Sequence, residues 1–293
     1  MLQEQGASSA SYLTTKEVAD ILRVKERKVY DLAAAGEIPH RRITGKLLFP
    51  RGELLDWIET GSAPAAAERP VVLTGSHDPL LDWAVRECGS GLATLFNGSR
   101  DGLDCFADGR AALAGLHIPD STGWNVEPIA ARGLKNVVLI AWASRARGLI
   151  VSQNATASIT DFAHLKGKRV VLRQPGAGGA TFFEDMLKRE GMSATDLELV
   201  SGLAHTEYDA AVAVAAGQAD AATGIEAMAR QFNLGFVPLA EERFDLLIDR
   251  HAYFTEPVQK LLSFAQSTAC REKAASMGGY DLSQMGTVRW LSE

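Results

Sequence analysis

The chain has 293 residues, of which 46% are hydrophobic, so it is long enough to form the cores of two or three domains. A net charge of −6 excludes a protein that coats nucleic acid without specificity, yet residues 23–51 hold eight Lys or Arg against three Asp or Glu. From residue 61 onward 21 basic residues face 27 acidic ones, and a basic segment on an acidic protein is typical of a specific DNA-binding protein.

Residues 1–11 have neither the basic start nor the apolar run of a signal peptide, and we expect a disordered tail there. No run of about 18 apolar residues occurs, so we expect no membrane partner and a cytoplasmic location. Cys88, Cys105 and Cys270 lack the close spacing of metal ligands and are expected to be separate reduced thiols. We therefore predict no metal and no cofactor.

Residues 12–60 have the pattern of a small helical DNA-binding domain. Thr14-x-x-Glu17 is a capping box that starts a helix, whose apolar face is expected to hold Val18, Ala19, Ile21 and Leu22. A second helix is predicted from Lys25 to Ala35, with Val29 and Leu32 facing inward, and Gly36 is expected to end it.

The second helix of a helix-turn-helix domain enters the major groove, so the polar residues near its start are candidate DNA contacts. A basic hairpin around Thr44-Gly45 follows as a predicted wing that reaches the DNA backbone or the minor groove. Arg51 opens a last short helix. The predicted DNA-binding residues are Lys25, Arg27, Lys28, Tyr30, Arg41, Arg42, Lys46 and Arg51. A three-helix domain with a solvated charged face is the alternative.

The segments TTKEVADIL, VYDLAAAGEIP, RITGKLLFP and LLDWI occur here in an order that resembles the excisionase/MerR-like family of winged helix-turn-helix domains. This resemblance spans nearly all of residues 12–60 and implies binding to double-stranded DNA. It does not distinguish a transcriptional from an architectural role.

Residues 61–69 are small, contain proline and lack periodicity, which predicts a linker. From residue 70 short apolar segments alternate with helical ones, which is typical of an α/β fold with parallel strands. Strands are expected at 71–75, 92–96, 111–118, 137–143, 168–172, 197–200, 219–223 and 236–239, and helices at 78–88, 101–108 and 181–190.

Small polar residues follow three of these strands, and ligands of open α/β sheets bind at the carboxyl ends of strands. The Gly-rich turn at 176–181 precedes a helix, whose first N–H groups bind anions. It is neither a Walker loop nor a good dinucleotide fingerprint, and a plain tight turn is the alternative. The candidate ligand residues at the strand ends are Ser76, His77, Asn97, Ser99, Gln174, Gly178, Gly179 and Thr181.

The segments TGSHD at 74–78, NGSRDGL at 97–103, RGLIV at 147–151, DFAHLKGKRVVLRQPGAGGAT at 161–181 and AAVAVAAGQADAATGIE at 210–226 resemble the periplasmic-binding-protein superfamily. The resemblance covers about 200 residues, specifically the cytosolic domain of this kind found behind helix-turn-helix heads. It implies a two-lobed α/β domain over 70–293, with lobe one at 70–143 and 227–293 and lobe two at 148–224. Where relatives have Gly-Ser-Gly-Thr-Arg, this chain has Gly-Ala-Gly-Gly-Ala-Thr, so the type of ligand is not carried over.

Two lobes imply two hinge crossings, which we place at 143–148 and 224–227. Arg145 and Arg147 at the first crossing are candidates to point into the cleft and neutralise an anion, with ordinary surface arginines as the alternative. Glu226 at the second crossing is predicted to pair with one of them and to belong to the ligand site.

These features favour a one-component transcriptional regulator, not an enzyme, that binds a small anionic ligand. Neutral hydroxyl and amide donors suit an oxyanion such as molybdate or tungstate, and a small carboxylate or sulfonate fits as well. We expect a homodimer, because one such head covers little DNA. G-x-S-x-G and H-E-x-x-H are missing from the sequence, so we name no catalytic residue and an α/β enzyme is less favoured. An excisionase-like architectural factor is the other alternative.

Overall fold

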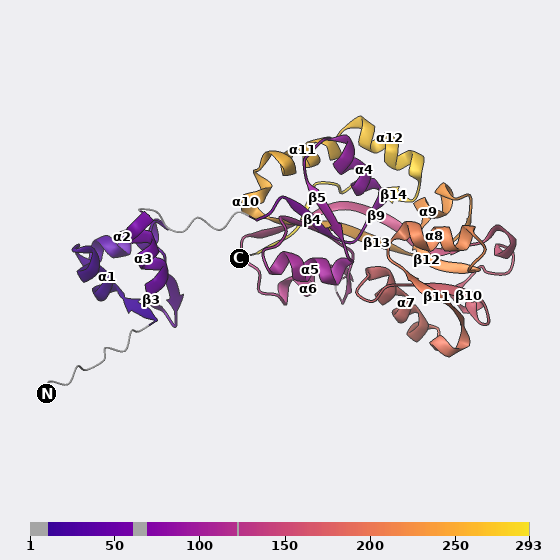
Figure 1. The fold of residues 1–293 in the computed structure, drawn as a ribbon, viewed down its shortest axis with the longest axis horizontal. Helices are drawn as coiled ribbons and strands as arrows, with labels where there is room; N and C mark the ends of the chain where they lie inside the picture. The colour runs from indigo at the N-terminus through magenta and orange to yellow at the C-terminus, as the bar shows by residue number, and fades with distance from the viewer. Residues whose placement is uncertain (1–10, 61–68, 122, 293) are drawn as a thin grey trace. The chain divides into compact units, whose positions relative to one another are not determined.

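The computed structural model describes residues 11–60, 69–121 and 123–292, and the chain divides into two compact units at the boundary between residues 68 and 69 (Figure 1). The predicted tail, apart from Ser11, and the predicted linker, apart from Arg69, lie outside the described residues. The two units are therefore described separately, the first as the head and the second as the sensor domain.

The head combines three helices with a small antiparallel sheet. In chain order its elements are β1 (Tyr12–Thr14), α1 (Thr15–Leu22), α2 (Glu26–Ala34), β2 (Arg41–Ile43), β3 (Lys46–Pro50) and α3 (Arg51–Thr60), and the strand order is β1-β3-β2. Val18, Val29, Phe49 and Leu54 are completely buried and come from four different elements. The helices and the sheet thus share one hydrophobic core.

Local signals fix both ends of the helix pair. The hydroxyl of Thr14 accepts the N–H of Glu17, and the carboxylate of Glu17 accepts the N–H of Thr14 at 2.7 Å, which confirms the capping box. Gly36 has φ +71°, and the N–H groups of Gly36 and Glu37 bond back to Ala33 and Leu32 as in a Schellman motif. Helix α2 therefore ends where the glycine predicts.

Two expectations for the head differ from the structure. Ile21 was expected on the apolar face of the first helix but is 45% exposed, because the buried stripe of α1 is formed by Thr15, Val18 and Ala19. The strand β1 was not predicted. Three residues carry no readable alternation, and the strand exists only because β3 pairs with it.

The sensor domain is built on one large mixed sheet whose main path runs β11-β10-β12-β9-β13-β6-β4-β5. The elements of its first half are β4 (Val72–Gly75), α4 (Pro79–Glu87), β5 (Ala93–Phe96), α5 (Ser99–Ala107), β6 (Leu113–Leu116), the hairpin β7 (Pro119–Asp120) and β8 (Gly123–Trp124), α6 (Val126–Ala130) and β9 (Val137–Val151). Strands β4, β5 and β6 are parallel to one another, as expected for alternating strands and helices.

The second half begins with short 3-10 turns at Gln153–Ala155 and Phe162–Leu165, and a third lies at Ala194–Asp196. Its other elements are β10 (Arg169–Arg173), α7 (Gly178–Arg189), β11 (Glu198–Ala204), α8 (Glu207–Ala215), β12 (Ala221–Ile225), α9 (Glu226–Gln231), β13 (Gly235–Asp249), α10 (Arg250–Tyr253), α11 (Glu256–Ala265), α12 (Thr268–Met277), β14 (Tyr280–Asp281) and β15 (Val288–Leu291). Strand β10 is parallel to both β11 and β12.

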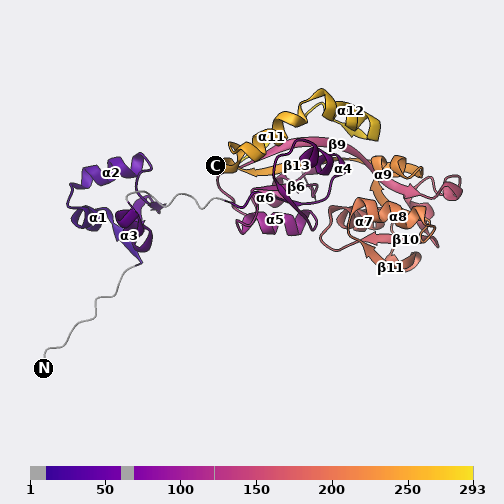
Figure 2. The same cartoon turned by 45° about the horizontal axis from the view of Figure 1, so that its top comes forward.

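Strands β9 and β13 join two lobes. Each is 15 residues long, and they pair antiparallel along almost their whole length. In lobe one, helices α4, α11 and α12 cover one face of the sheet and α5 and α6 cover the other (Figures 1 and 2). In lobe two, α7 packs on one face and α8 and α9 on the other. The hinge is therefore a continuous two-stranded ribbon.

Two boundaries that the sequence predicts at the hinge differ from the structure. The strand predicted at 137–143 continues to Val151, because the polar stretch after it is buried by partners from elsewhere in the chain. The predicted second crossing at 224–227 is wrong: Ala227, Met228 and Ala229 belong to the core of lobe two. The chain returns to lobe one within β13, between Ala240 and Phe244, which pack against different lobes.

The C-terminal segment runs along the hinge. Strands β14 and β15 pair with β9, and Met277 and Tyr280 contact hydrophobic clusters of both lobes. Among the described residues, no helix has the length and apolar character needed to cross a membrane.

Candidate functional site

Helix α2 presents the predicted DNA-reading residues to solvent. Lys25 is its N-cap, and Arg27, Lys28 and Tyr30 are exposed, while Val29 is completely buried in the head core. Tyr30 is 52% exposed, which is high for a large aromatic side chain that has only to pack. A recognition helix contacts base edges through side chains near its start, and these exposed residues lie in that part of α2.

The wing divides its cations between two faces. Thr44 and Gly45 form the turn, both with positive φ, between β2 and β3. Arg41 and Arg42 are neighbours in β2 and therefore point to opposite sides of the sheet, and Arg41 is held by Glu53 at 2.8 Å. Lys46 and Arg51 are exposed as well. The structure thus brings Lys25, Arg27, Lys28 and Tyr30 together on α2, and it places the four remaining cations along β2, β3 and the start of α3.

A group of charged side chains lies buried where the two lobes meet the hinge. We call it the interlobe charge cluster, and its charged members are Asp78, Arg145, Arg147, Arg173, Glu207 and Glu242. None of them is more than 6% exposed. Asp78 belongs to lobe one, Arg173 and Glu207 to lobe two, and the other three to the hinge strands. The cluster therefore ties together all three parts of the sensor domain.

The two hinge arginines pair with carboxylates of the chain itself. Arg145 lies 2.7 Å from Asp78 and also binds Glu242. Arg147 contacts Glu242 through Nε and Nη2, and its Nη2 also donates to Glu207 at 2.8 Å. Arg173 reaches the same Glu207 oxygen at 2.7 Å. Three arginines thus face three carboxylates, and with a neutral His117 the cluster has no net charge.

The electrostatics keep these carboxylates ionised. Burial alone would raise the pKa of Glu207, but the Arg147 and Arg173 guanidinium groups bring it down to about 2. Burial acts on Glu242 in the same way, yet Arg145 and Arg147 hold its pKa well below the usual range. Asp78 is also the N-cap of α4 and accepts hydrogen bonds from Trp142 and Tyr280.

His117 links the charges to two buried hydroxyl groups. Its Nδ1 lies 3.0 Å from Glu242 and its Nε2 lies 2.9 Å from the hydroxyl of Ser76, so Nδ1 is the donor and Nε2 the acceptor. Ser99 donates to Ser76 at 3.0 Å and accepts the N–H of His117. Burial lowers the pKa of His117 despite the nearby carboxylate, which keeps the ring neutral.

The first turn of α7 meets this ring closely. A Cβ on Gly178 would lie 2.7 Å from Nδ1 of His117, so only glycine allows the approach. A Cβ on Gly179 would lie 3.3 Å from Nη1 of Arg147. The predicted Gly-rich turn is in fact the start of the helix, and no side chain caps it. The start of α7 therefore lies against His117 and Arg147.

Some predicted ligand residues lie in or against this cluster and others do not. Ser76, Ser99, Arg145, Arg147, Gly178 and Gly179 do. Gln174 instead donates to the carbonyl of Asn97 at 3.0 Å, which fastens one lobe to the other. His77 lies beside Asp82 and the ring of Phe96, and Thr181 is half-buried on α7.

The predicted pairing of Glu226 is wrong. Glu226 lies 2.5 Å from Arg230 on the same helix, and the hinge arginines pair with Asp78, Glu207 and Glu242 instead. The sequence reading missed these three carboxylates, together with His117 and Arg173. One signal was available: Arg145 and Arg147 lie two apart on a strand, so both face one side and require anionic partners there if that side is buried.

Four side-chain atoms of the cluster are buried without a hydrogen-bond partner among the described residues: Nε of Arg145, Nη1 of Arg147, Nη1 of Arg173 and Oε2 of Glu207. Nη1 of Arg173 still lies 2.7 Å from a Glu207 oxygen as an ion pair, and because buried polar atoms are usually bonded, the other three leave donor and acceptor capacity unused. The described part of the chain holds no group of three His, Cys, Asp or Glu that suits a metal ion.

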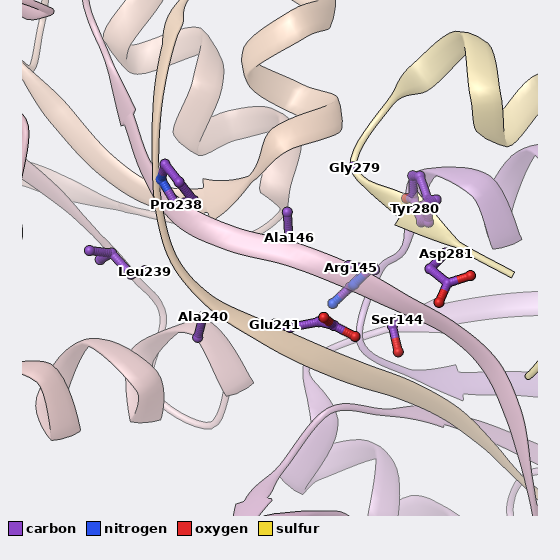
Figure 3. A pocket seen from close by; sticks show the side chains of 10 residues that line it. All are labelled: Ser144, Arg145, Ala146, Pro238, Leu239, Ala240, Glu241, Gly279, Tyr280 and Asp281. Atoms are coloured by element: carbon purple, nitrogen blue, oxygen red, sulfur yellow. The ribbon is translucent and has the colours of Figure 1, made fainter. Parts of the chain in front are cut away.

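A hollow of about 470 Å³ lies at the hinge where β9, β13 and β14 meet (Figure 3). Pro238, Leu239 and Ala240 supply much of its apolar lining, and Glu241 and Asp281 add carboxylates. Arg145 of the interlobe charge cluster also lines the hollow, so the hollow borders the cluster. Glu241 is exposed, whereas the next residue, Glu242, is completely buried.

Comparison with known proteins finds a family match for each of the two units. Residues 83–266 match the family model of the PBP superfamily domain, which is more than half of the chain. The chain belongs to the periplasmic-binding-protein superfamily. Residues 12–62 of this PBP-like protein also match a helix-turn-helix domain, which supports DNA binding by the head. Both matches agree with the resemblances seen in the sequence.

Two relatives are similar in sequence to this PBP-like protein. It is 24% identical over 311 residues to the uncharacterized protein YvgK of Bacillus subtilis, a match that covers 96% of this chain and 98% of that one. It is 36% identical over 76 residues, 26% of this chain and 67% of the other, to an uncharacterized Clostridium pasteurianum protein from the 5′ region of a ferredoxin gene. The first match covers nearly the whole of both chains, so the two proteins have similar lengths.

Two solved structures share the fold. A phosphate ABC transporter substrate-binding protein of Clostridium perfringens with bound phosphate has a TM-score of 0.52 at 14% identity, covering 74% of this chain and 98% of its own. A hydrogen-peroxide-bound OxyR mutant of Corynebacterium glutamicum has a TM-score of 0.50 at 13% identity, covering 90% and 89%. At such identities the likeness concerns the fold alone.

Proposed function

We propose that the protein is a ligand-responsive DNA-binding regulator, in which the head binds DNA and the PBP-like domain senses a small molecule between its lobes. The observation that carries this proposal is the interlobe charge cluster, which joins both lobes to the hinge in a chain that also has a helix-turn-helix head. Charges buried at a movable interface are costly unless matched, so a change in their partners changes the preferred lobe arrangement.

The ligand in this proposal is a small anion. Three buried arginines, the uncapped start of α7 and the hydroxyl groups of Ser76 and Ser99 converge on the cluster. The unpartnered Nη1 of Arg147 faces Gly179 in the first turn of that helix, and helix N-termini favour negative charge. An oxyanion such as molybdate or tungstate, or a small carboxylate, has the acceptor atoms for these donors.

Lobe rearrangement supplies the regulatory signal. The lobes contact one another through Gln174 and Asn97, and through the N–H of Arg100 and the carbonyl of Gly176. An anion that competes for the arginines shifts the balance between lobe arrangements by its difference in affinity for them. A homodimer of such chains then reads a repeated or palindromic DNA site with a spacing that the ligand alters.

The proposal is tested with the full-length protein and a duplex selected by it from a random DNA pool. Thermal unfolding is measured with sodium molybdate, tungstate, sulfate, phosphate and acetate at matched ionic strength, and duplex affinity is then measured with each. We expect one anion class to raise the unfolding temperature and to change the affinity. Duplex binding that none of these anions alters would contradict the regulator and favour an architectural DNA-binding factor.

A further inference from the structure

We infer that Glu242 is a built-in counter-anion: its carboxylate occupies the position between the hinge arginines that an external anion would otherwise take. This inference rests on the proposed function and names the feature that sets its ligand threshold. A ligand anion then has to compete with a carboxylate that the chain itself supplies, at very high local concentration, from strand β13.

The surroundings of Glu242 are those of a bound anion. Its two oxygens face only donors: Nη2 of Arg145, Nε and Nη2 of Arg147, and Nδ1 of His117. The side chain is completely buried. Donors come from lobe one through His117 and from the hinge through the two arginines, so the carboxylate bridges separate elements as a ligand would.

The backbone that carries Glu242 is the hinge. Glu242 lies directly opposite Arg145 in the register of β9 and β13. The pairing is irregular on both sides of it, between Pro238 and Ala240 and between Phe244 and Asp245. Such irregularities bend and twist a strand. A change in the lobe angle therefore moves this carboxylate relative to His117, which is fixed to lobe one.

The charge balance of the cluster limits how an external anion can bind there. The cluster holds three arginines and three carboxylates around a neutral His117, so another anion would leave an uncompensated buried negative charge. An external anion can bind strongly only where a chain carboxylate gives up its arginines. Glu242 is the carboxylate shared by both hinge arginines, whereas Asp78 is also held by Trp142 and Tyr280.

The test replaces the tethered carboxylate with a free one. Glu242→Ala removes a CH₂ and a carboxylate, which acetate matches in size and charge. The full-length variant should unfold at a lower temperature than wild type, and acetate should restore about 3 to 6 °C once its concentration is about tenfold above its Kd. Chloride at equal ionic strength and pivalate, which has the same charge but is too bulky, should give no such rise.

The matched control is Glu241→Ala, which removes the same group from the neighbouring exposed position on the same strand. In Glu241→Ala and in wild type, acetate should raise the unfolding temperature by less than it does in Glu242→Ala, because the Glu242 carboxylate still occupies the site. If Glu242→Ala does not accumulate as folded protein, both variants are refolded from urea, and acetate should raise the yield of Glu242→Ala alone.

Equal effects of acetate and chloride on Glu242→Ala, or an acetate effect of the same size on Glu241→Ala, would overturn the inference. This outcome is distinguishable from failure of the proposed function. Acetate rescue depends only on the site that the side chain leaves, whereas the proposed function fails if wild-type DNA binding ignores every anion tested.

Discussion

The head and the sensor domain use arginine in opposite ways. In the head, Arg27, Arg42 and Arg51 are exposed to solvent, where they can bind DNA phosphates without giving up a strong partner. In the sensor domain, Arg145 and Arg147 are buried and their charges are balanced by carboxylates of the chain. An exposed arginine gains by binding an anion, whereas a buried and matched arginine must exchange one anion for another. The first arrangement suits attachment, and the second suits a switch.

The largest expected effect on the free energy of unfolding comes from removing a buried arginine of the sensor domain. Arg147→Ala leaves Glu207 and Glu242 without a shared partner, and loss of one member of a buried ion pair costs about 3–5 kcal/mol. Urea unfolding of the full-length protein measures this loss in the sensor-domain transition. Arg169→Ala, which removes an exposed pair with Asp220, is the control and should cost less than about 1 kcal/mol. Similar losses for both variants would contradict a matched buried cluster.

Acid should weaken the same cluster. The pKa of Glu207 is about 2 in the folded protein against an ordinary value of 4.5, so the folded state binds its proton later than the unfolded state does. The stability that this group contributes, roughly 3 kcal/mol, is complete above pH 4.5 and is lost as the pH falls toward 2. The stability difference between wild type and Glu207→Gln should therefore shrink as the pH is lowered from 5 to 3. A constant difference would assign Glu207 no charge-dependent role.

Substitution of an exposed arginine of the head should weaken DNA binding and leave the stability of the fold unchanged. Arg27→Ala is expected to weaken duplex binding about tenfold and to reduce the salt dependence by about 0.9 for a lost phosphate contact. Its unfolding temperature should stay unchanged, because the side chain is exposed. Lys16→Ala on α1 removes the same charge from another exposed helix position and is the control. Equal affinity losses in the two variants would show that only total charge matters.

The smallest expected effect concerns the N-terminal cap of helix α1 in the head. Thr14→Ala removes the hydroxyl that accepts the N–H of Glu17 and should cost about 1 kcal/mol in the head transition alone. Thr160→Ala in the sensor domain, whose hydroxyl contacts only His164, is a comparable exposed change outside the head. A loss that appeared in the sensor-domain transition would show that the two units do not unfold independently.

The sequence predicted what local chemistry determines. The capping box at Thr14, the glycine that ends α2 and the alternation of strands and helices all depend on neighbouring residues, and the structure confirms them. Strand β1 and the full length of β9 were not predicted, because each is defined by a partner strand distant in sequence. Pairing, rather than propensity, decides such segments.

The site was predicted only in outline, for the same reason. The sequence placed Arg145 and Arg147 at a hinge but paired one of them with Glu226, which is a partner of Arg230. Their true partners lie 60 to 97 positions away, at Glu207 and Glu242 and at Asp78. No short motif marks a carboxylate that becomes close only when a sheet of this topology forms.

The most direct test measures DNA affinity while the buried cluster is altered chemically. Fluorescence anisotropy on the selected duplex compares full-length wild type, Glu242→Ala and Glu241→Ala, each in acetate and in chloride at equal ionic strength. We predict that Glu242→Ala alone changes its affinity with acetate, by about fivefold or more, toward the wild-type value. Acetate that stabilises Glu242→Ala yet leaves its DNA affinity unchanged would show that the sensor domain does not control the head, and would contradict the proposed regulation.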